Sequence, residues 1–181
     1  MSSPTTLPGT APKVIKEGSY GCVHGPPLQC EAPAEPNTPD QITKLMKKTD
    51  AENELKEHQW INWADSQHTF SLAPPKACKV DRSPANIAAV KKCQKIGKKA
   101  AEALDQYRLL VMKRGGDDLA DYTQKVAKLP STDKTRKRIQ YMWIELHHMM
   151  MGIRTLVEHG LVHHDLKREN ILYCCLLYTS P

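Results

Sequence analysis

Aromatic side chains are scarce in this sequence. Only 6% of its residues are aromatic and one of them is Phe, so a hydrophobic core must be built largely from Leu, Ile, Val and Met. There is also no secretory leader, and no apolar run reaches the roughly 18 residues that a membrane span needs. These absences predict a soluble, intracellular protein without a membrane partner.

The cysteines lack the C-x-x-C spacing of many redox and zinc sites. Intracellular proteins keep most of their thiols reduced. We therefore expect free, reduced thiols at all six positions, which are Cys22, Cys30, Cys78, Cys93, Cys174 and Cys175.

The length and charge of the chain limit the choice of protein class. Its 181 residues, 40% of them hydrophobic, suffice for about one globular domain. Lys and Arg outnumber Asp and Glu by 26 to 20, which gives a net charge of +6. This excess favours anionic partners, such as nucleotide phosphate, nucleic acid or an acidic protein surface.

The two ends of the chain differ from its middle. Residues 1–13 (MSSPTTLPGTAPK) contain three prolines and no apolar periodicity, which predicts a disordered lead-in. Residues 175–181 (CLLYTSP) resemble the translated read-through of a sequencing adaptor, and such a tail is excluded from fold reasoning. An ordinary short terminal segment is the alternative.

Short strands are predicted on both sides of a proline-rich loop. Residues 14–25 (VIKEGSYGCVHG) suggest two strands around a tight glycine turn. Five prolines within residues 26–40 exclude a central strand or helix there. Further strands are expected at residues 41–46 (QITKLM), within 74–80 (PPKACKV) and at 107–112 (YRLLVM).

A first helix is predicted at residues 51–64. Glu57, Trp60, Ile61 and Ala64 fall on one helical stripe, with Glu54 one turn earlier. A charged residue that opens an apolar stripe suggests a buried or half-buried ion pair.

Two more segments have helical character. Residues 84–106 look helical and very basic, with five lysines between Lys91 and Lys99. The clearest helix spans 138–159, where Gly160 provides a stop and apolar residues recur at spacings of four and three. Those apolar residues are Met142, Leu146, Met149, Ile153 and Leu156. The order of strands, helix, strands and helices fits a two-lobed α+β chain.

Glycines and a lysine in the first strands could bind phosphate. Gly18 and Gly21 allow the backbone to approach a ligand closely, although a plain hairpin turn is the alternative. No G-K-S or G-K-T follows, so this is not a P-loop. Lys44 could clamp phosphate oxygens if a helical carboxylate, Glu54 or failing that Glu57, positioned it. An edge-strand lysine that points to water is the alternative.

The strongest local chemistry lies in residues 161–170 (LVHHDLKREN). Asp165 can accept a hydroxyl proton, Lys167 can neutralise charge on a transferred phosphoryl group, and Asn170 offers an oxygen ligand to Mg²⁺. A short irregular loop could bring these side chains together. A solvated charged turn is the alternative.

Taken in order, these motifs resemble those of a eukaryotic-type protein kinase. GSYGCV is similar to the end of the G-x-G-x-x-G-x-V loop, QITK to the strand with the V-A-I-K lysine, and HHDLKREN to H-R-D-L-x-x-x-N. GCVHGPPLQC and LLVMKRGGDDL resemble in particular the divergent kinases of large double-stranded DNA viruses. The resemblance extends over residues 14–173.

The resemblance implies a two-lobed protein-kinase-like fold. Residues 14–113 would form a small antiparallel β-sheet lobe with helix C, a proline-rich insertion and the basic helical segment. Residues 114–174 would begin a helical lobe and end in the catalytic loop. The chain would be a Ser/Thr protein kinase that uses ATP and Mg²⁺ on a protein substrate, in the cytoplasm of a host cell or in a virion.

The resemblance also implies roles for individual residues. Asp165 would be the catalytic base, Lys167 the phosphate contact and Asn170 a Mg²⁺ ligand. Lys44 would hold the α- and β-phosphates and pair with Glu54. The remaining ATP contacts would be the glycine loop (Gly18, Tyr20, Gly21 and Val23) and the hinge (Val111, Met112 and Lys113).

Three departures from the kinase pattern change these expectations. Lys16 stands at the usual first glycine of the loop, which could stiffen it over the nucleotide. His164 replaces the Arg that commonly pairs with a phosphorylated activation loop. No D-F-G or A-P-E occurs in the sequence. The resemblance therefore implies an incomplete fragment that is inactive by itself.

Other functions compete with this interpretation. A pseudokinase or a small-molecule kinase could use the same fold. A nucleic-acid-binding module could use the lysines of residues 91–99 and the KTRKR segment at 134–138, although a solvated helix face is the simpler explanation. A metal site could use the six residues His147, His148, His159, His163, His164 and Asp165. Gly160 argues against the metal site because it separates His159 from His163.

Overall fold

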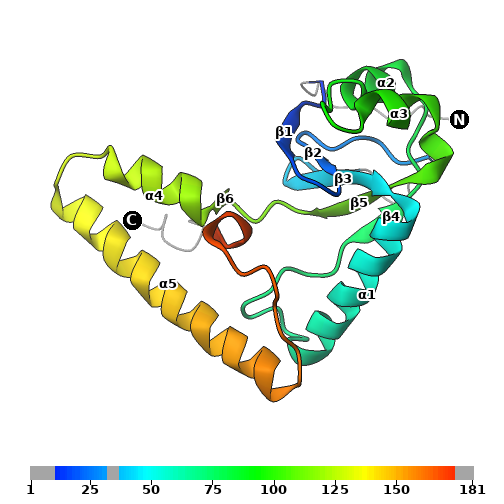
Figure 1. The fold of residues 1–181 in the computed structure, drawn as a ribbon. Coiled ribbons are helices and arrows are strands. Elements are labelled where there is room, and N and C mark those ends of the chain that lie inside the picture. Colours follow the sequence, from blue (N-terminus) through cyan, green and yellow to red (C-terminus); the bar gives the residue numbers. More distant parts are fainter. Residues whose placement is uncertain (1–10, 32–36, 174–181) are drawn as a thin grey trace, which may run out of the picture. The chain divides into compact units, whose positions relative to one another are not determined.

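The computed structural model describes residues 11–31 and 37–173. The chain is a mixed α+β protein that divides into two compact units (Figure 1). The first unit contains residues up to 59 together with 73–114, and the second contains 60–72 and the residues from 115 onwards. The expected lead-in, apart from residues 11–13, and the expected adaptor tail lie outside the described residues.

The first unit is built on a five-stranded antiparallel sheet with the order β1-β2-β3-β5-β4. All the strands predicted from the sequence are present. They are β1 (Val14–Glu17), β2 (Cys22–His24), β3 (Gln41–Lys47), β4 (Lys76–Cys78) and β5 (Tyr107–Lys113). In the described part of residues 26–40 there is no strand, and Cys30 makes only an isolated bridge to Val80.

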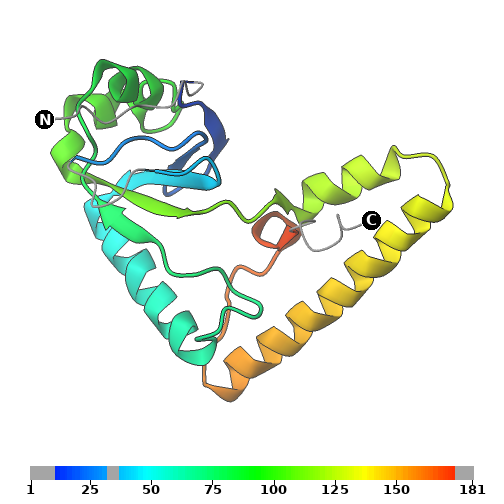
Figure 2. The same cartoon turned by 180° about the vertical axis from the view of Figure 1, so that it is seen from behind.

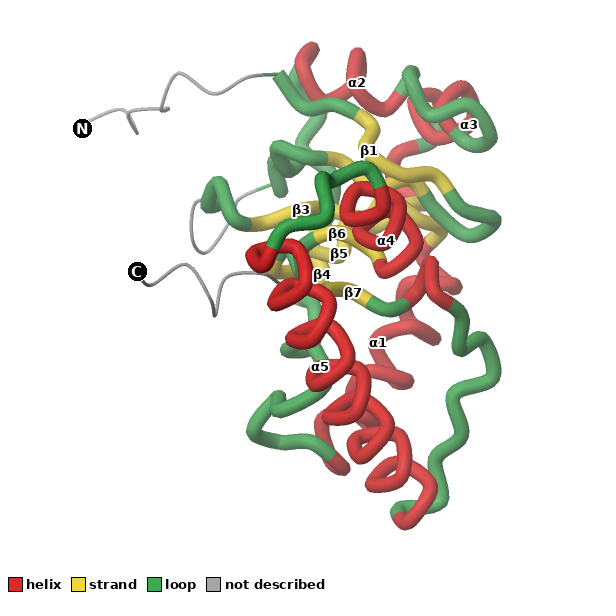
Figure 3. Tube along the Cα trace, turned by 90° about the vertical axis from the view of Figure 1, so that its left-hand side faces the viewer, coloured by secondary structure: helices red, strands yellow, loops and turns green. Residues whose placement is uncertain are grey.

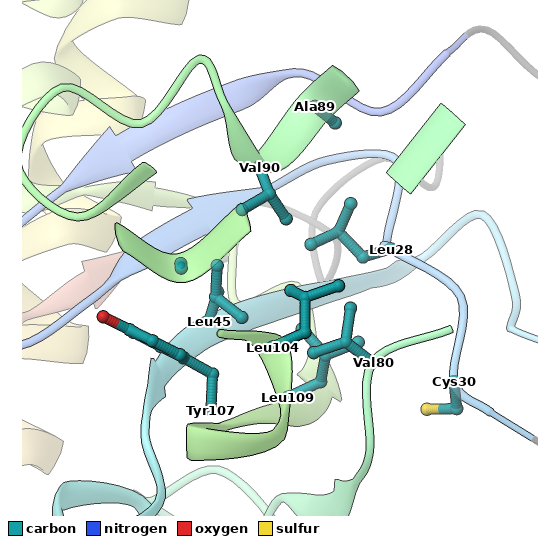
Figure 4. Packing of buried hydrophobic residues seen from close by; sticks show 10 residues of the cluster. Leu28, Cys30, Leu45, Val80, Ala89, Val90, Leu104, Tyr107 and Leu109 are labelled. Carbon is teal, nitrogen blue, oxygen red and sulfur yellow. The ribbon is translucent and has the colours of Figure 1, made fainter. Parts of the chain in front are cut away.

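The sheet buries apolar side chains on both faces because successive strand residues point to opposite sides. Leu45 and Leu109 enter a core with residues of α2 (Pro84–Val90) and α3 (Gly97–Glu102). Figure 4 shows the packing of this core. Their neighbours Met46 and Leu110 instead pack with Ala51 of α1 (Lys48–Ala64).

The basic segment at residues 84–106 is not one helix. Ser83 caps α2, and Pro84 occupies its first turn, where a missing N–H costs nothing. A turn then separates α2 from α3, and the 3₁₀ helix η1 (Leu104–Gln106) follows. At Gly97 a β-carbon would lie 2.6 Å from the Val90 carbonyl oxygen, so this turn requires glycine. Lys91, Lys92 and Lys95 therefore fall in the turn rather than on a helix.

The expectation of reduced thiols is wrong for four cysteines. Cys22 is joined to Cys93 and Cys30 to Cys78 by disulfides, across 71 and 48 residues of sequence. Short spacings such as C-x-x-C cannot reveal pairs that only the folded sheet brings together. Cys174 and Cys175 lie outside the described residues.

The helix expected at 51–64 is present as α1, but its predicted stripe is not buried. Trp60 is 63% exposed and Glu57 is also exposed, whereas Glu54 is half-buried. The apolar contact of α1 with the sheet comes from Ala51 and Leu55, nearer the start of the helix. Periodicity placed the helix correctly, but of the predicted stripe only Ile61 and Ala64 are half-buried, whereas Glu57 and Trp60 are exposed.

The second unit contains α4 (Leu119–Ala127), α5 (Asp133–Glu158) and a two-stranded sheet of β6 (Asp117–Asp118) and β7 (Leu172–Tyr173), shown in Figures 2 and 3. Its small core joins Tyr122, Val126 and Tyr173, with Met142 packed against them.

The long helix of this unit was predicted to begin at residue 138, whereas α5 begins at Asp133. Gly160, the predicted stop, follows the helix with a positive φ of 73°. Of the predicted stripe Leu156 is buried, and the other four residues are half-buried. No helix in the described part of the chain is long and apolar enough to cross a membrane.

A buried aspartate organises the loop between α1 and β4. The carboxylate of Asp65, 5% exposed, accepts hydrogen bonds of 2.8–3.1 Å from the backbone and hydroxyl groups of Thr69 and Ser71 and from the backbone of Phe70. Burial raises the pKa of Asp65, but these donors outweigh burial and lower the pKa well below its ordinary value. Phe70 packs against Gly152 of α5, where a β-carbon would lie 2.3 Å from its ring.

Asp65→Asn is expected to destabilise the second unit by about 3 kcal/mol, because buried donors lose a charged acceptor and face an amide N–H₂. Since the folded-state pKa is lowered, the stabilisation by Asp65 is present above the unfolded pKa and is lost as pH falls. Urea unfolding followed by circular dichroism measures the change. Glu52→Gln, which removes only an exposed partner of Lys48, is the control. Equal stability of the two variants would contradict this role.

Candidate functional site

The glycine turn joins β1 to β2. The backbone N–H of Gly18 donates to the carbonyl oxygen of Gly21 at 2.9 Å, which closes the turn. A β-carbon at Gly21 would lie 2.8 Å from the Leu45 carbonyl oxygen, so a larger residue would push β2 away from β3. Apart from Gly18 and its two chain neighbours, no atom of the described residues lies within 4 Å of the corresponding position at Gly18, and Tyr20 is 72% exposed at the tip. The turn therefore has room on its outer side.

Lys44 lies on β3 opposite Val23 of β2. It projects to the same side of the sheet as Met46, toward α1. Its Nζ lies 2.5 Å from Glu54 Oε2, and the two side chains are 26% and 21% exposed. The sequence left Glu54 and Glu57 as possible partners, and the structure pairs Lys44 with Glu54. Lys44 is half-buried and paired, and β3 lies inside the sheet. It is therefore not an edge-strand lysine that points to water.

The end of β5 carries the three residues assigned to the hinge. Val111, Met112 and Lys113 pair in register with the first residues of β3. The backbone N–H of Arg114 donates to the Asp40 carbonyl oxygen at 2.8 Å and continues this pairing. The first two side chains are half-buried and Lys113 is exposed. The segment is thus fixed by backbone hydrogen bonds to the strand that carries Lys44.

In the second unit, the loop after α5 brings Asp165, Lys167 and Asn170 together. Lys167 Nζ donates to Asp165 Oδ2 at 2.8 Å. Asn170 Nδ2 donates to the same oxygen at 2.8 Å and to the Asp165 carbonyl oxygen at 2.9 Å. The 3₁₀ turn η2 (Arg168–Asn170) returns Asn170 toward Asp165, and Ile171 then accepts a backbone hydrogen bond from Leu119 of α4.

The charges of this loop depend on one another. Hydrogen bonds from Lys167 and then Asn170 lower the pKa of Asp165, while Asp165 raises the pKa of Lys167. At neutral pH the loop therefore presents a carboxylate beside an ammonium group. All three side chains are exposed. The arrangement could accept a hydroxyl proton and place a positive charge next to it.

The histidines proposed as a rival metal site do not converge. His159 lies with Nδ1 2.8 Å from the Thr155 carbonyl oxygen and with its ring edge-on to Trp63. Within residues 11–31 and 37–173, the one group of three possible metal ligands is Cys22, His24 and Cys93. This group was not among the metal ligands predicted from the sequence. The C-x-H spacing in a strand was a usable signal, because alternate residues share a face.

Comparison with known proteins gives no family for this chain. No family model matches it, and no curated protein matches it either. Any functional conclusion therefore rests on the motifs and on the geometry of the two groups of side chains described above.

Lys167→Met is expected to raise the pKa of Asp165 toward its ordinary value, because the ammonium group is the first cause of the lowering. A pH titration of the Asp165 carboxyl carbon by NMR measures this shift. Arg168→Met is the matched control, since its guanidinium pairs with Glu169 instead. An Asp165 titration that is unchanged by the loss of Lys167 would contradict the ion pair.

Proposed function

We propose that this chain carries the ATP-binding and catalytic-loop parts of a protein kinase, which transfers the γ-phosphoryl group of ATP to Ser or Thr hydroxyls of a protein. The observation that carries the proposal is the half-buried ion pair between Lys44 on a central strand and Glu54 on α1. Protein kinases use such a lysine and helical glutamate to hold ATP phosphates. The catalytic-loop motif in the second unit supports the same reaction.

The first unit would bind the nucleotide. Lys44, oriented by Glu54, would place its ammonium group on the α- and β-phosphate oxygens, where a charge-assisted hydrogen bond is stronger than a neutral one. Gly18 and Gly21 would bring the turn close to the phosphates, together with Tyr20 and Val23. The adenine would contact the hinge residues, Val111, Met112 and Lys113.

The second unit would supply the reacting groups. Asp165, kept ionised by its lowered pKa, would accept the proton of the substrate hydroxyl. Lys167 would neutralise negative charge on the transferred phosphoryl group. Asn170 uses Nδ2 to bind Asp165, which leaves its amide oxygen as a fitting ligand for Mg²⁺. When bound, Mg²⁺ neutralises charge on the phosphates.

The setting of the reaction is part of the same proposal. The resemblance to kinases of large DNA viruses favours the cytoplasm of a host cell or a virion. The substrate would be a protein, and neither a membrane nor nucleic acid would be a partner. The net charge of +6 is compatible with an anionic nucleotide as the first ligand.

Lys44→Met is expected to weaken ATP binding by roughly 10- to 100-fold, because a hydrogen bond to a charged group contributes about 1.5–3 kcal/mol. Binding of a fluorescent ATP analogue to the full chain, with Mg²⁺ present, measures the change. Lys47→Met is the matched control, since Lys47 is exposed on the same strand. Because no D-F-G occurs in the sequence, nucleotide binding rather than phosphoryl transfer tests the proposal in this chain.

Two results would overturn the proposal. The first is ATP affinity that is equal in the Lys44→Met variant, the Lys47→Met variant and the unmodified chain. The second is an absence of nucleotide binding combined with salt-dependent binding to nucleic acid, which would favour the basic nucleic-acid-binding module.

A further inference from the structure

Two cysteines and a histidine lie close together beside the strand that follows the glycine turn. The proposed kinase chemistry uses none of them. Cys22 and His24 lie two residues apart on β2 and so face the same side of the sheet. Cys93 comes from the turn between α2 and α3. The three residues are 0%, 0% and 3% exposed, and their possible ligand atoms all lie within 4.8 Å of one another.

The position of His24 fits a metal ligand. Its Nε2 lies 3.6 Å from Cys93 Sγ and 3.9 Å from Cys22 Sγ. Zinc binds sulfur at about 2.3 Å and imidazole nitrogen at about 2.0–2.1 Å, so tetrahedral coordination separates nitrogen from sulfur by about 3.6 Å. The histidine already stands near this separation from both sulfurs. In the structure the two sulfurs are bonded to each other, and reduction would leave them free to move apart.

The two ring nitrogens of His24 have different surroundings. Nε2 lies next to the two sulfurs of Cys22 and Cys93. Nδ1 is buried without a hydrogen bond among the described residues. Nε2 is therefore the ring nitrogen that could bind a metal ion together with the two sulfurs.

We propose that Cys22, His24 and Cys93 form a site for a thiophilic d¹⁰ metal ion, Zn²⁺ or Cu⁺, when the Cys22–Cys93 disulfide is reduced. Thiolate and imidazole ligands select these ions. A dithiol reductant gives two electrons and two protons to the disulfide and is itself oxidised to a disulfide. The metal ion then displaces the two thiol protons and bonds to both sulfurs and to Nε2.

The site would have a structural role in a reducing compartment. The Cys22–Cys93 disulfide ties β2 to the turn after α2. Next to it, the Glu17 carboxylate accepts hydrogen bonds from the backbone N–H groups of Gln94 and Lys95 at 2.8 and 2.6 Å. Because cytosolic conditions break most disulfides, a metal ion would replace the covalent link and keep the end of the glycine turn attached to this turn.

The full chain, purified with a dithiol reductant and then freed of it, tests the site. Elemental analysis after incubation with Zn²⁺ should find one zinc ion per reduced chain and none on the oxidised chain. Co²⁺ should give thiolate-to-cobalt charge-transfer absorption, and titration with Cu⁺ under anaerobic conditions shows which ion binds more tightly. A reduced chain that takes up none of these ions would overturn the proposal.

Variants locate the site. Cys93→Ser and His24→Asn should each lose stoichiometric zinc. Cys78→Ser, which alters the other disulfide, and His163→Asn, which alters an exposed histidine, should keep it. Zinc that survives loss of Cys93 and His24 but disappears with His163 would assign it to the histidine-rich loop instead. Circular dichroism checks that each variant folds.

Alkylation tests the site in the unmodified chain, so its result does not depend on whether a variant folds. With Zn²⁺ bound, Cys22 and Cys93 should react with iodoacetamide more slowly than in the reduced, metal-free chain, as mapped by mass spectrometry. Cys30 and Cys78 should react equally with and without zinc. Equal reaction of Cys22 and Cys93 in the two states would overturn the proposal.

Discussion

The alternation of side chains along β3 is the constraint on which the first unit depends. Leu45 enters the core under α2 and α3, whereas its neighbours Lys44 and Met46 face α1. One face therefore provides apolar packing, and the other combines packing with a cation. The ion pair with Glu54 follows from this geometry, because packing of Ala51 against Met46 brings the first turns of α1 to the sheet.

The catalytic-loop residues depend on a different kind of support. Their loop contains no regular strand, so Asp165 is held by side-chain donors and by the short turn that returns Asn170 to it. The pairing of β7 with β6 fixes the chain immediately afterwards. Lys167 and Asn170 share one oxygen of Asp165, which links the charge of the carboxylate to the conformation of the loop.

Cys22 shows how one position can belong to two features. Its backbone continues the glycine turn into β2, while its side chain enters a buried group with His24 and Cys93. A change in the chemical state of the sulfur would therefore act beside the turn that the proposed function assigns to ATP. This proximity follows from the hairpin and does not depend on whether the group binds a metal ion.

Hydrophobic periodicity, glycines and prolines act over a few residues, so the sequence predicted the five strands of the main sheet, the two long helices and the order of the motifs. It did not predict the short strands β6 and β7. It did not determine the break in the basic segment, where Gly97 packs against the Val90 carbonyl, nor the exposure of Trp60. It left the partner of Lys44 open. Glu54 becomes this partner, and Cys22 meets Cys93 across 71 residues, in the folded chain, because such contacts depend on the register of the sheet and the packing of helices on its faces.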